Sequence, residues 1–203
     1  SSAFEFETSD PEKFDFGGHA EIAPQRFSVE AYHKLAELGI LSDEDRVELL
    51  EGVISPTMVH SPIHGAVVSV VEPLLRPLVD PQCPLRIQSS VALAHSEPEP
   101  DLAVVMGDPL RYVERHPGGQ DVALVVEVAE TSVYRDRVKA ASYAQAGIPV
   151  YWIVNLKQRR LEVGQMPKGD EYAERLMLEP GNQIELSIGF LPGAGVQVGD
   201  LFP

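Results

Sequence analysis

The segment from Val122 to Tyr143 reads VALVVEVAETSVYRDRVKAASY, and the rest of the chain can be arranged around it. Its first eight residues are aliphatic except for Glu127, a pattern typical of a strand buried on both faces. Thr131 or Ser132 can cap the helix that follows, and Gly147-Ile-Pro149 ends that helix. We therefore predict a central strand that leads directly into a helix.

This segment places an acid in a strand and a lysine on the next helix. A buried carboxylate such as Glu127 costs free energy unless it is paired. Asp136, Lys139 and Tyr143 are three and four residues apart, so they share one helix face, which can lie near the strand. The alternative is that Glu127 is exposed at a strand end and Lys139 is an ordinary solvated lysine.

A second acid begins a second apolar strand. Pro100-Asp101 precedes Leu-Ala-Val-Val, a run of the length expected for the interior of a sheet. A loop over residues 107–119, rich in glycine and proline, follows this run. Because a single excursion separates Asp101 from Glu127, we expect the two acids on neighbouring strands.

The remaining patterns predict an α/β or α+β fold, with a mixed central sheet flanked by helices and further antiparallel strands at the C-terminus. Residues 25–203 form one domain in this interpretation, and residues 1–24 form an acidic arm that is flexible or packs on a partner subunit. The other expected elements are helices over 28–38 and 65–78, two short strands within 47–54, and strands over 84–93, 149–154, 161–164, 172–178, 183–186 and 196–202.

Composition limits the function classes. The 203 residues are 44% apolar, enough for a real core, and the formal net charge is -15. Such a charge repels phosphate backbones, so a nucleic-acid role requires acids that bind metal, segregated charge, or a basic groove formed by an oligomer. A single cysteine, Cys83, and the absence of an export signal or membrane span favour a cytoplasmic protein that does not contact a membrane.

Four other residues are candidates of lower weight. Glu48 precedes a Glu-Gly turn and, taken alone, is a surface acid. His60 and His64 have the spacing of a helical metal pair, but a proline lies between them and no glutamate follows His60, so the zinc-protease motif is absent. We keep His64 as a candidate, the alternative being a histidine that only begins a helix. Glu99 can share a strand face with the next acid and add either a ligand or only repulsion.

Two acids on neighbouring strands with a nearby lysine suit phosphodiester hydrolysis. Carboxylates such as Asp101 and Glu127 bind Mg²⁺ or Mn²⁺ through oxygen, and the backbone carbonyl of Val128 is the expected third ligand. A bound metal lowers the pKa of a water, while Lys139 orients the water or neutralises the phosphoryl anion. Serine-hydrolase chemistry is set aside because the chain has no GxSxG motif.

In their order along the chain, these residues resemble the PD-(D/E)xK nuclease superfamily and, within it, the Uma-type family of putative restriction endonucleases. The resemblance runs from about Phe27 to Phe202. It is carried by Glu48-Leu-Leu-Glu-Gly, His64, Pro100-Asp101, Val126-Glu127-Val128, Asp136, Lys139, Tyr143 and Tyr151-Trp152-Ile153-Val154.

The resemblance implies a restriction-endonuclease-like core with divalent-metal nuclease chemistry. Asp101 and Glu127 would be the metal ligands and Glu48 an acid contributed from the N-terminal side, with supporting roles for the histidine, aspartate and tyrosine of the motif. The superfamily places a lysine two residues after the second acid, where this chain has Ala129. Lys139 resembles its migrated replacement.

The leading hypothesis is a metal-dependent endonuclease that acts on DNA, as a homo-oligomer, most simply a dimer. A second hypothesis is a catalytically degenerate protein that keeps the fold for binding or as a scaffold, favoured by the net charge and by Ala129. A third is a metal-dependent hydrolase of smaller phosphoesters, because the same ligands would serve it.

Overall fold

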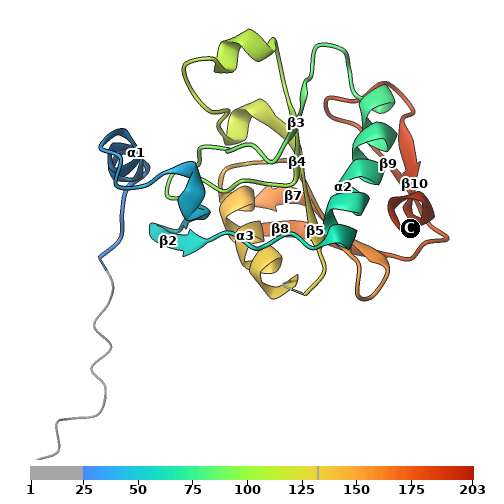
Figure 1. Cartoon of the computed structure of the whole chain (residues 1–203). Helices are drawn as coiled ribbons and strands as arrows, with labels where there is room; N and C mark the ends of the chain where they lie inside the picture. Colours follow the sequence, from blue (N-terminus) through green and yellow to red (C-terminus); the bar gives the residue numbers. More distant parts are fainter. Residues whose placement is uncertain (1–24, 132) are drawn as a thin grey trace, which may run out of the picture.

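A six-stranded mixed sheet forms the centre of the computed structural model, which describes residues 25–131 and 133–203. The strand order is β3-β4-β5-β6-β7-β8, and only β5 and β6 run parallel. Helix α3 forms the crossover that this parallel pair needs (Figure 1). The bounds are β3 Leu85–Ile87, β4 Leu102–Val105, β5 Val122–Ala129, α3 Val133–Gln145, β6 Val150–Asn155, β7 Arg160–Lys168 and β8 Glu171–Leu178.

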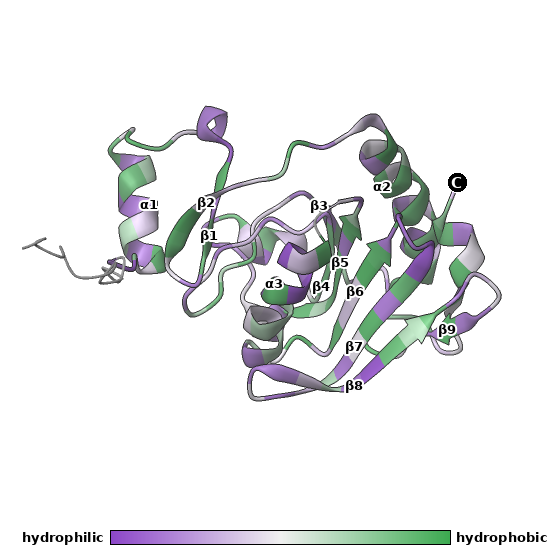
Figure 2. Ribbon diagram, turned by 90° about the horizontal axis from the view of Figure 1, so that it is seen from below, coloured by the Kyte–Doolittle hydropathy of each residue, from purple (hydrophilic) through white to green (hydrophobic). Residues whose placement is uncertain are grey.

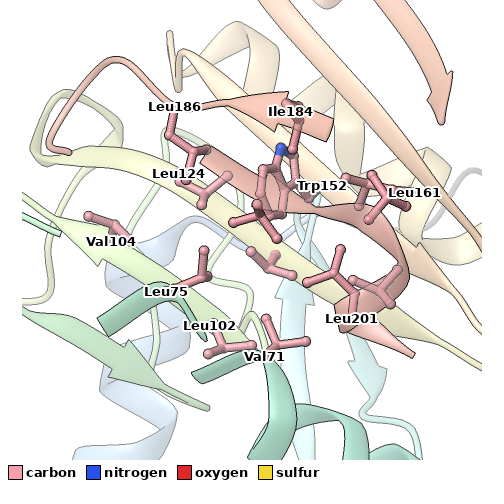
Figure 3. Packing of buried hydrophobic residues seen from close by; sticks show 14 of the residues in the cluster. Val71, Leu75, Leu102, Val104, Leu124, Trp152, Leu161, Ile184, Leu186 and Leu201 are labelled. Atoms are coloured by element: carbon pink, nitrogen blue, oxygen red, sulfur yellow. The ribbon is translucent and has the colours of Figure 1, made fainter. Parts of the chain in front are cut away.

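One face of this sheet is covered by α2 (Pro62–Leu75) and by the C-terminal pair β9 (Gln183–Glu185) and β10 (Gly195–Gln197). Alternate residues of the strands point toward it and form an apolar cluster. Trp152 lies in the middle of this cluster, near Ile184 (Figure 3). The layer of α2 and the C-terminal strands is therefore joined to the sheet by an apolar core.

The opposite face is covered by α3 (Figure 1). Val125 and Ala129 of β5 point to this side, where they pack with Tyr143 of the helix and Tyr151 of β6. The tyrosine hydroxyls are satisfied within the structure, since that of Tyr151 donates to the Asp136 carbonyl at 2.8 Å. The α3 side is thus more polar than the α2 side.

The N-terminal part of the described chain stands apart at one end of the molecule. Helix α1 (Val29–Glu37) begins after Ser28, whose hydroxyl accepts the Ala31 N–H, and none of its residues is buried. A hairpin of β1 (Val47–Leu50) and β2 (Val53–Pro56) lies next to it (Figure 2). A bridge between Leu49 and Glu97 attaches the hairpin to the body.

The mixed sheet, its flanking helices and the additional C-terminal antiparallel strands confirm the predicted fold class. The predicted arm over residues 1–24 and the candidate cap Ser132 lie outside the described residues. Within the described ranges, no helix combines the length and the apolar character needed to cross a bilayer.

Four predicted elements had the wrong boundaries, among them the strand expected over 161–164, which is observed as β7 from Arg160 to Lys168. The strand expected over 84–93 ends at Ile87, because Gln88 has a φ of 43° that breaks the ladder. Helix α2 begins at Pro62 rather than Gly65, since Ser61 caps it and proline suits the first helical position. The final strand expected over 196–202 is only β10, and a 3-10 helix over Val198–Leu201 follows it.

Candidate active site

An open cleft of about 940 Å³ lies where the hairpin, the start of α2, the ends of β4 and β5, and the start of α3 meet. Most of the residues predicted from the sequence line it, although they come from five different elements or their flanking loops. Tyr143 is the exception and lies behind the cleft wall. The lining residues among the predicted set are Glu48, His64, Asp101, Glu127, Val128, Asp136 and Lys139.

Asp101 comes directly before β4, and Glu127 lies on β5. Leu102 pairs with Val126, so continuing this antiparallel register by one residue brings Asp101 beside Glu127. Each is 4% exposed. The Asp101 Oδ2 atom accepts the N–H of Val128 at 2.8 Å. The peptide of Val128 therefore lies beside this acid, and the ligand role of its carbonyl stays a prediction.

Lys139 lies between two carboxylates. Its Nζ atom is 3.0 Å from Oε1 of Glu127 and 3.3 Å from Oε2 of Glu48, and the lysine is 6% exposed. The hydroxyl of Tyr143 also donates to Oε1 of Glu127, at 3.0 Å. Because positions 139 and 143 are one turn apart on α3, a single helix face supplies both partners of the buried acid.

Arg135 belongs to the same network, although the sequence did not single it out. Its guanidinium donates to Oε1 of Glu48 at 2.7 Å, and the backbone N–H of Glu99 donates to Oε2 of Glu48 at 3.2 Å. The available signal was its position four residues before Lys139 on the same helix face. Glu48 is therefore a buried acid between two cations, and the surface alternative for it is wrong.

Burial and crowding of like charges change the acidity of these groups. Burial raises the pKa of Glu127 to about 8, against the opposing effect of Lys139, and burial likewise raises the pKa of Asp136 to about 6. Burial alone would lower the pKa of Lys139, but the carboxylates of Glu127, Glu48 and Asp136 outweigh it and raise that pKa above its ordinary value. Lys139 is therefore a permanent cation at neutral pH, in a site with a surplus of acids.

The histidines occupy the other side of Asp101. His64 Nε2 lies 3.0 Å from Oδ2 of Asp101, and His60 Nε2 lies 4.0 Å from Oδ1. The two rings are stacked, with centroids 4.0 Å apart. Burial, followed by the neighbouring His64, lowers the pKa of His60. The sequence showed the spacing of this pair, but only His64 was kept as a candidate because His60 lies in a loop.

The donor chemistry of the cleft fits a divalent cation. Five buried carboxylates line it, and Lys139 and Arg135 pair with only two of them, Glu48 and Glu127; the other three are those of Glu97, Asp101 and Asp136. Oxygen ligands of this kind suit Mg²⁺ or Mn²⁺, and an added cation would relieve the repulsion between the acids that adds to the effect of burial on the pKa values of Glu127 and Asp136. Glu99 contributes an exposed carboxyl at the rim, and partial desolvation raises its pKa.

Comparisons with known proteins concern the family and the fold. The sequence model of a family described as "Uma2: Putative restriction endonuclease" matches residues 29–199. Among solved structures, the chain is similar to a protein titled a putative nuclease belonging to DUF820 from Anabaena variabilis ATCC 29413. The TM-score is 0.68 at 14% identity, over 86% of this chain and 97% of the other, a likeness that concerns the fold. No curated protein gave a significant match.

Proposed function

This chain belongs to the Uma2 family, described as putative restriction endonucleases, and on that premise we propose that it is a divalent-metal-dependent endonuclease that hydrolyses phosphodiester bonds in DNA. The family description supports a nuclease-like function. Metal dependence and the DNA substrate are our own extension of it, made from the side chains in the cleft.

The observation that carries the proposal is the Asp101–Glu127 pair with Lys139 beside it. Asp101 comes directly before β4, Glu127 lies on the neighbouring strand β5, and the lysine amine is 3.0 Å from Glu127. A lysine near two carboxylates at the mouth of a cleft serves phosphoryl transfer, because the lysine offsets anionic charge while the acids hold a cation. This placement also accounts for Ala129, since a helix lysine reaches the place that a strand lysine would fill.

Each residue of the cleft has a separate role in the proposed reaction. Asp101 and Glu127 would hold Mg²⁺ or Mn²⁺, which when bound activates a water and offsets phosphate charge. Lys139 stays protonated, so it stabilises the anion that builds up on phosphorus and does not act as a base. The oxygen of water forms a bond to phosphorus, the bond to the leaving alkoxide breaks, and the water proton ends on the leaving oxygen.

Arg135 and Glu48 support this arrangement from one side. Oε1 of Glu48 lies 2.7 Å from Nη2 of Arg135, and Oε2 of Glu48 lies 3.3 Å from Nζ of Lys139, so Glu48 fixes the orientation of the lysine side chain. The protein is acidic overall, and the bound cation together with Lys139 and Arg135 would supply the positive charge that a phosphate backbone needs. Strong dependence of binding on the metal is a consequence of this proposal.

The test is cleavage of supercoiled plasmid and single-stranded DNA by the purified chain with Mg²⁺, Mn²⁺ or a chelator. We expect nicking that needs metal and falls by at least about a hundredfold in Asp101→Asn and in Glu127→Gln, because each removes an oxygen ligand. Glu185→Gln is the matched control, since this acid is exposed on β9, away from the cleft.

Three outcomes contradict the proposal. Cleavage that survives both cleft substitutions would place the chemistry elsewhere. A wild type that binds DNA without metal-dependent cleavage would indicate a binding or scaffold protein. Faster turnover of bis-p-nitrophenyl phosphate than of either DNA would indicate a hydrolase of small phosphoesters.

A further inference from the structure

His60, His64 and Asp101 form a cluster that the proposed pair of acids does not explain. One ligand atom from each residue lies within 4.8 Å of the other two. Both imidazoles approach the carboxylate through Nε2, at 4.0 and 3.0 Å. Two imidazole nitrogens and a carboxylate oxygen that converge on one point make a recognised donor set for a divalent transition metal.

The chain around the histidines is held in place before any ion binds. Ser61, between them, accepts the N–H of His64 at 3.2 Å as the cap of α2, and its hydroxyl donates to Glu130. The amide nitrogen of Gln88 donates to Nδ1 of His60 at 2.8 Å, which fixes the orientation of this ring.

The second ring lacks an independent structural reason for its position. Nδ1 of His64 is buried and has no hydrogen-bond partner within residues 25–131 and 133–203. A buried histidine with a purely structural role normally satisfies both nitrogens. Here only Nε2 makes a hydrogen bond, with Asp101, while the ring itself stacks on His60.

Charge separates this cluster from the Lys139 side of the cleft. Glu127 and Glu48 each have a lysine or arginine nitrogen within 3.3 Å. In the described part of the chain, Asp101 has no lysine or arginine within 4.0 Å, and its only side-chain partners of potential positive charge are the two histidines. A buried carboxylate that has no permanently charged partner is the group that a bound metal ion would stabilise most.

We propose that His60, His64 and Asp101 bind one divalent transition-metal ion, with Zn²⁺ and Mn²⁺ preferred over Mg²⁺. Imidazole nitrogen suits Zn²⁺, and Mn²⁺ accepts it more readily than Mg²⁺, which prefers oxygen ligands in a strict octahedron. His60 is exposed, and its ring lines the cleft, so further coordination positions face the open space. The inference deepens the proposed function, on which it rests for the use of the metal, but binding itself requires no nuclease activity.

The test is calorimetric titration of the untagged full chain, without nucleic acid, using ZnCl₂, MnCl₂ and MgCl₂. We expect one site for Zn²⁺ in the wild type and an affinity at least about tenfold lower for Mg²⁺. His60→Asn should weaken Zn²⁺ binding by about ten- to a hundredfold, because it removes one ligand. Since His60 is exposed, this variant is expected to fold, and circular dichroism checks that it does.

Two variants make the result specific. His95→Asn removes an exposed histidine outside the cleft lining, and it should keep the wild-type Zn²⁺ affinity. Asp101→Asn should lose binding as His60→Asn does. Titration with Co²⁺ adds a spectroscopic readout, since its visible bands should change in His60→Asn and not in His95→Asn.

Equal Zn²⁺ affinity in the wild type and His60→Asn overturns the proposal, and so does a wild type that binds no Zn²⁺ or Mn²⁺. Failure of the nuclease proposal is seen separately in the plasmid assay. Binding that depends on His60 without any cleavage would remove only the nuclease function, whereas Mg²⁺-dependent cleavage with full Zn²⁺ affinity in His60→Asn would remove only this inference.

Discussion

The α2 face and the α3 face of the central sheet are built from alternate residues of the same strands, yet they carry different chemistry. In β5, Val126 points to the apolar cluster under α2, while the next residue, Glu127, lies among charged groups beside α3. Seven of the eight β5 residues are apolar. The comparison teaches that one sheet can supply stability on one side and hold buried ions on the other.

The largest expected effect comes from removing the centre of the α2 face. Trp152→Ala should lower the free energy of unfolding by about 4 kcal/mol, because it leaves a large cavity in a fully buried cluster. Urea denaturation measures this. Tyr134→Ala is the matched control, since Tyr134 is 81% exposed on α3, and it should change stability by less than about 0.5 kcal/mol. A similar loss of unfolding free energy in both variants would contradict the expectation that only the buried aromatic residue stabilises the fold.

The second-largest effect is expected from the buried charged groups on the α3 face. Lys139→Met should lower the free energy of unfolding by about 3 kcal/mol at pH 9, above the pKa of Glu127, because Glu127 and Glu48 lose their shared cation. Adding Glu127→Gln to this variant should recover part of the loss, which a double-mutant cycle measures. Lys168→Met, at an exposed position, is the control. Full stability of Lys139→Met would mean that the buried ions are not energetically coupled.

The smallest effect is a dependence on pH. Burial raises the pKa of Glu127 from 4.5 to about 8, so the folded state binds this proton more tightly, and stability should fall as pH rises toward 8. His60, with a lowered pKa, acts in the opposite direction below pH 6.5, so the informative window is pH 6.5 to 8. With chelator present, we expect a loss on the order of 1–2 kcal/mol across that window.

Glu127→Gln should remove most of this slope, because it takes away the group that titrates. Thermal unfolding followed at several pH values measures it, with Glu185→Gln as the exposed control. A slope that remains unchanged in Glu127→Gln would assign the titration to another group.

Sequence patterns predicted the sheet better than its edges. The long apolar runs of β4 and β5 and the helix after them are strong local signals, since periodicity follows directly from burial. The strand expected over 84–93 failed because Val91 and Leu93 are buried without belonging to a strand. Buried loop residues have the same composition as strand residues, and a backbone angle such as that of Gln88 leaves no trace in the pattern.

For the site, local spacing identified the residues of α3 and the two strand acids. The contact between Glu48 and Lys139 joins residues that are far apart in the chain, so only the folded structure could reveal it. His60 was missed because its position depends on the loop before α2 and on the cap at Ser61, not on a helical repeat.

The placement of Lys139 on α3 also constrains which length changes the chain can accept. A helix turns by about 100° per residue, so one residue inserted between Val133 and Val138 would swing the lysine away from Glu127. A lysine at position 129, two residues after Glu127 on β5, would keep its distance to Glu127 after such an insertion, because both residues belong to the same strand. In this protein the first turn of α3 therefore behaves as a fixed-length spacer, while residues 113–115, which are exposed between β4 and β5, can accept an insertion more easily.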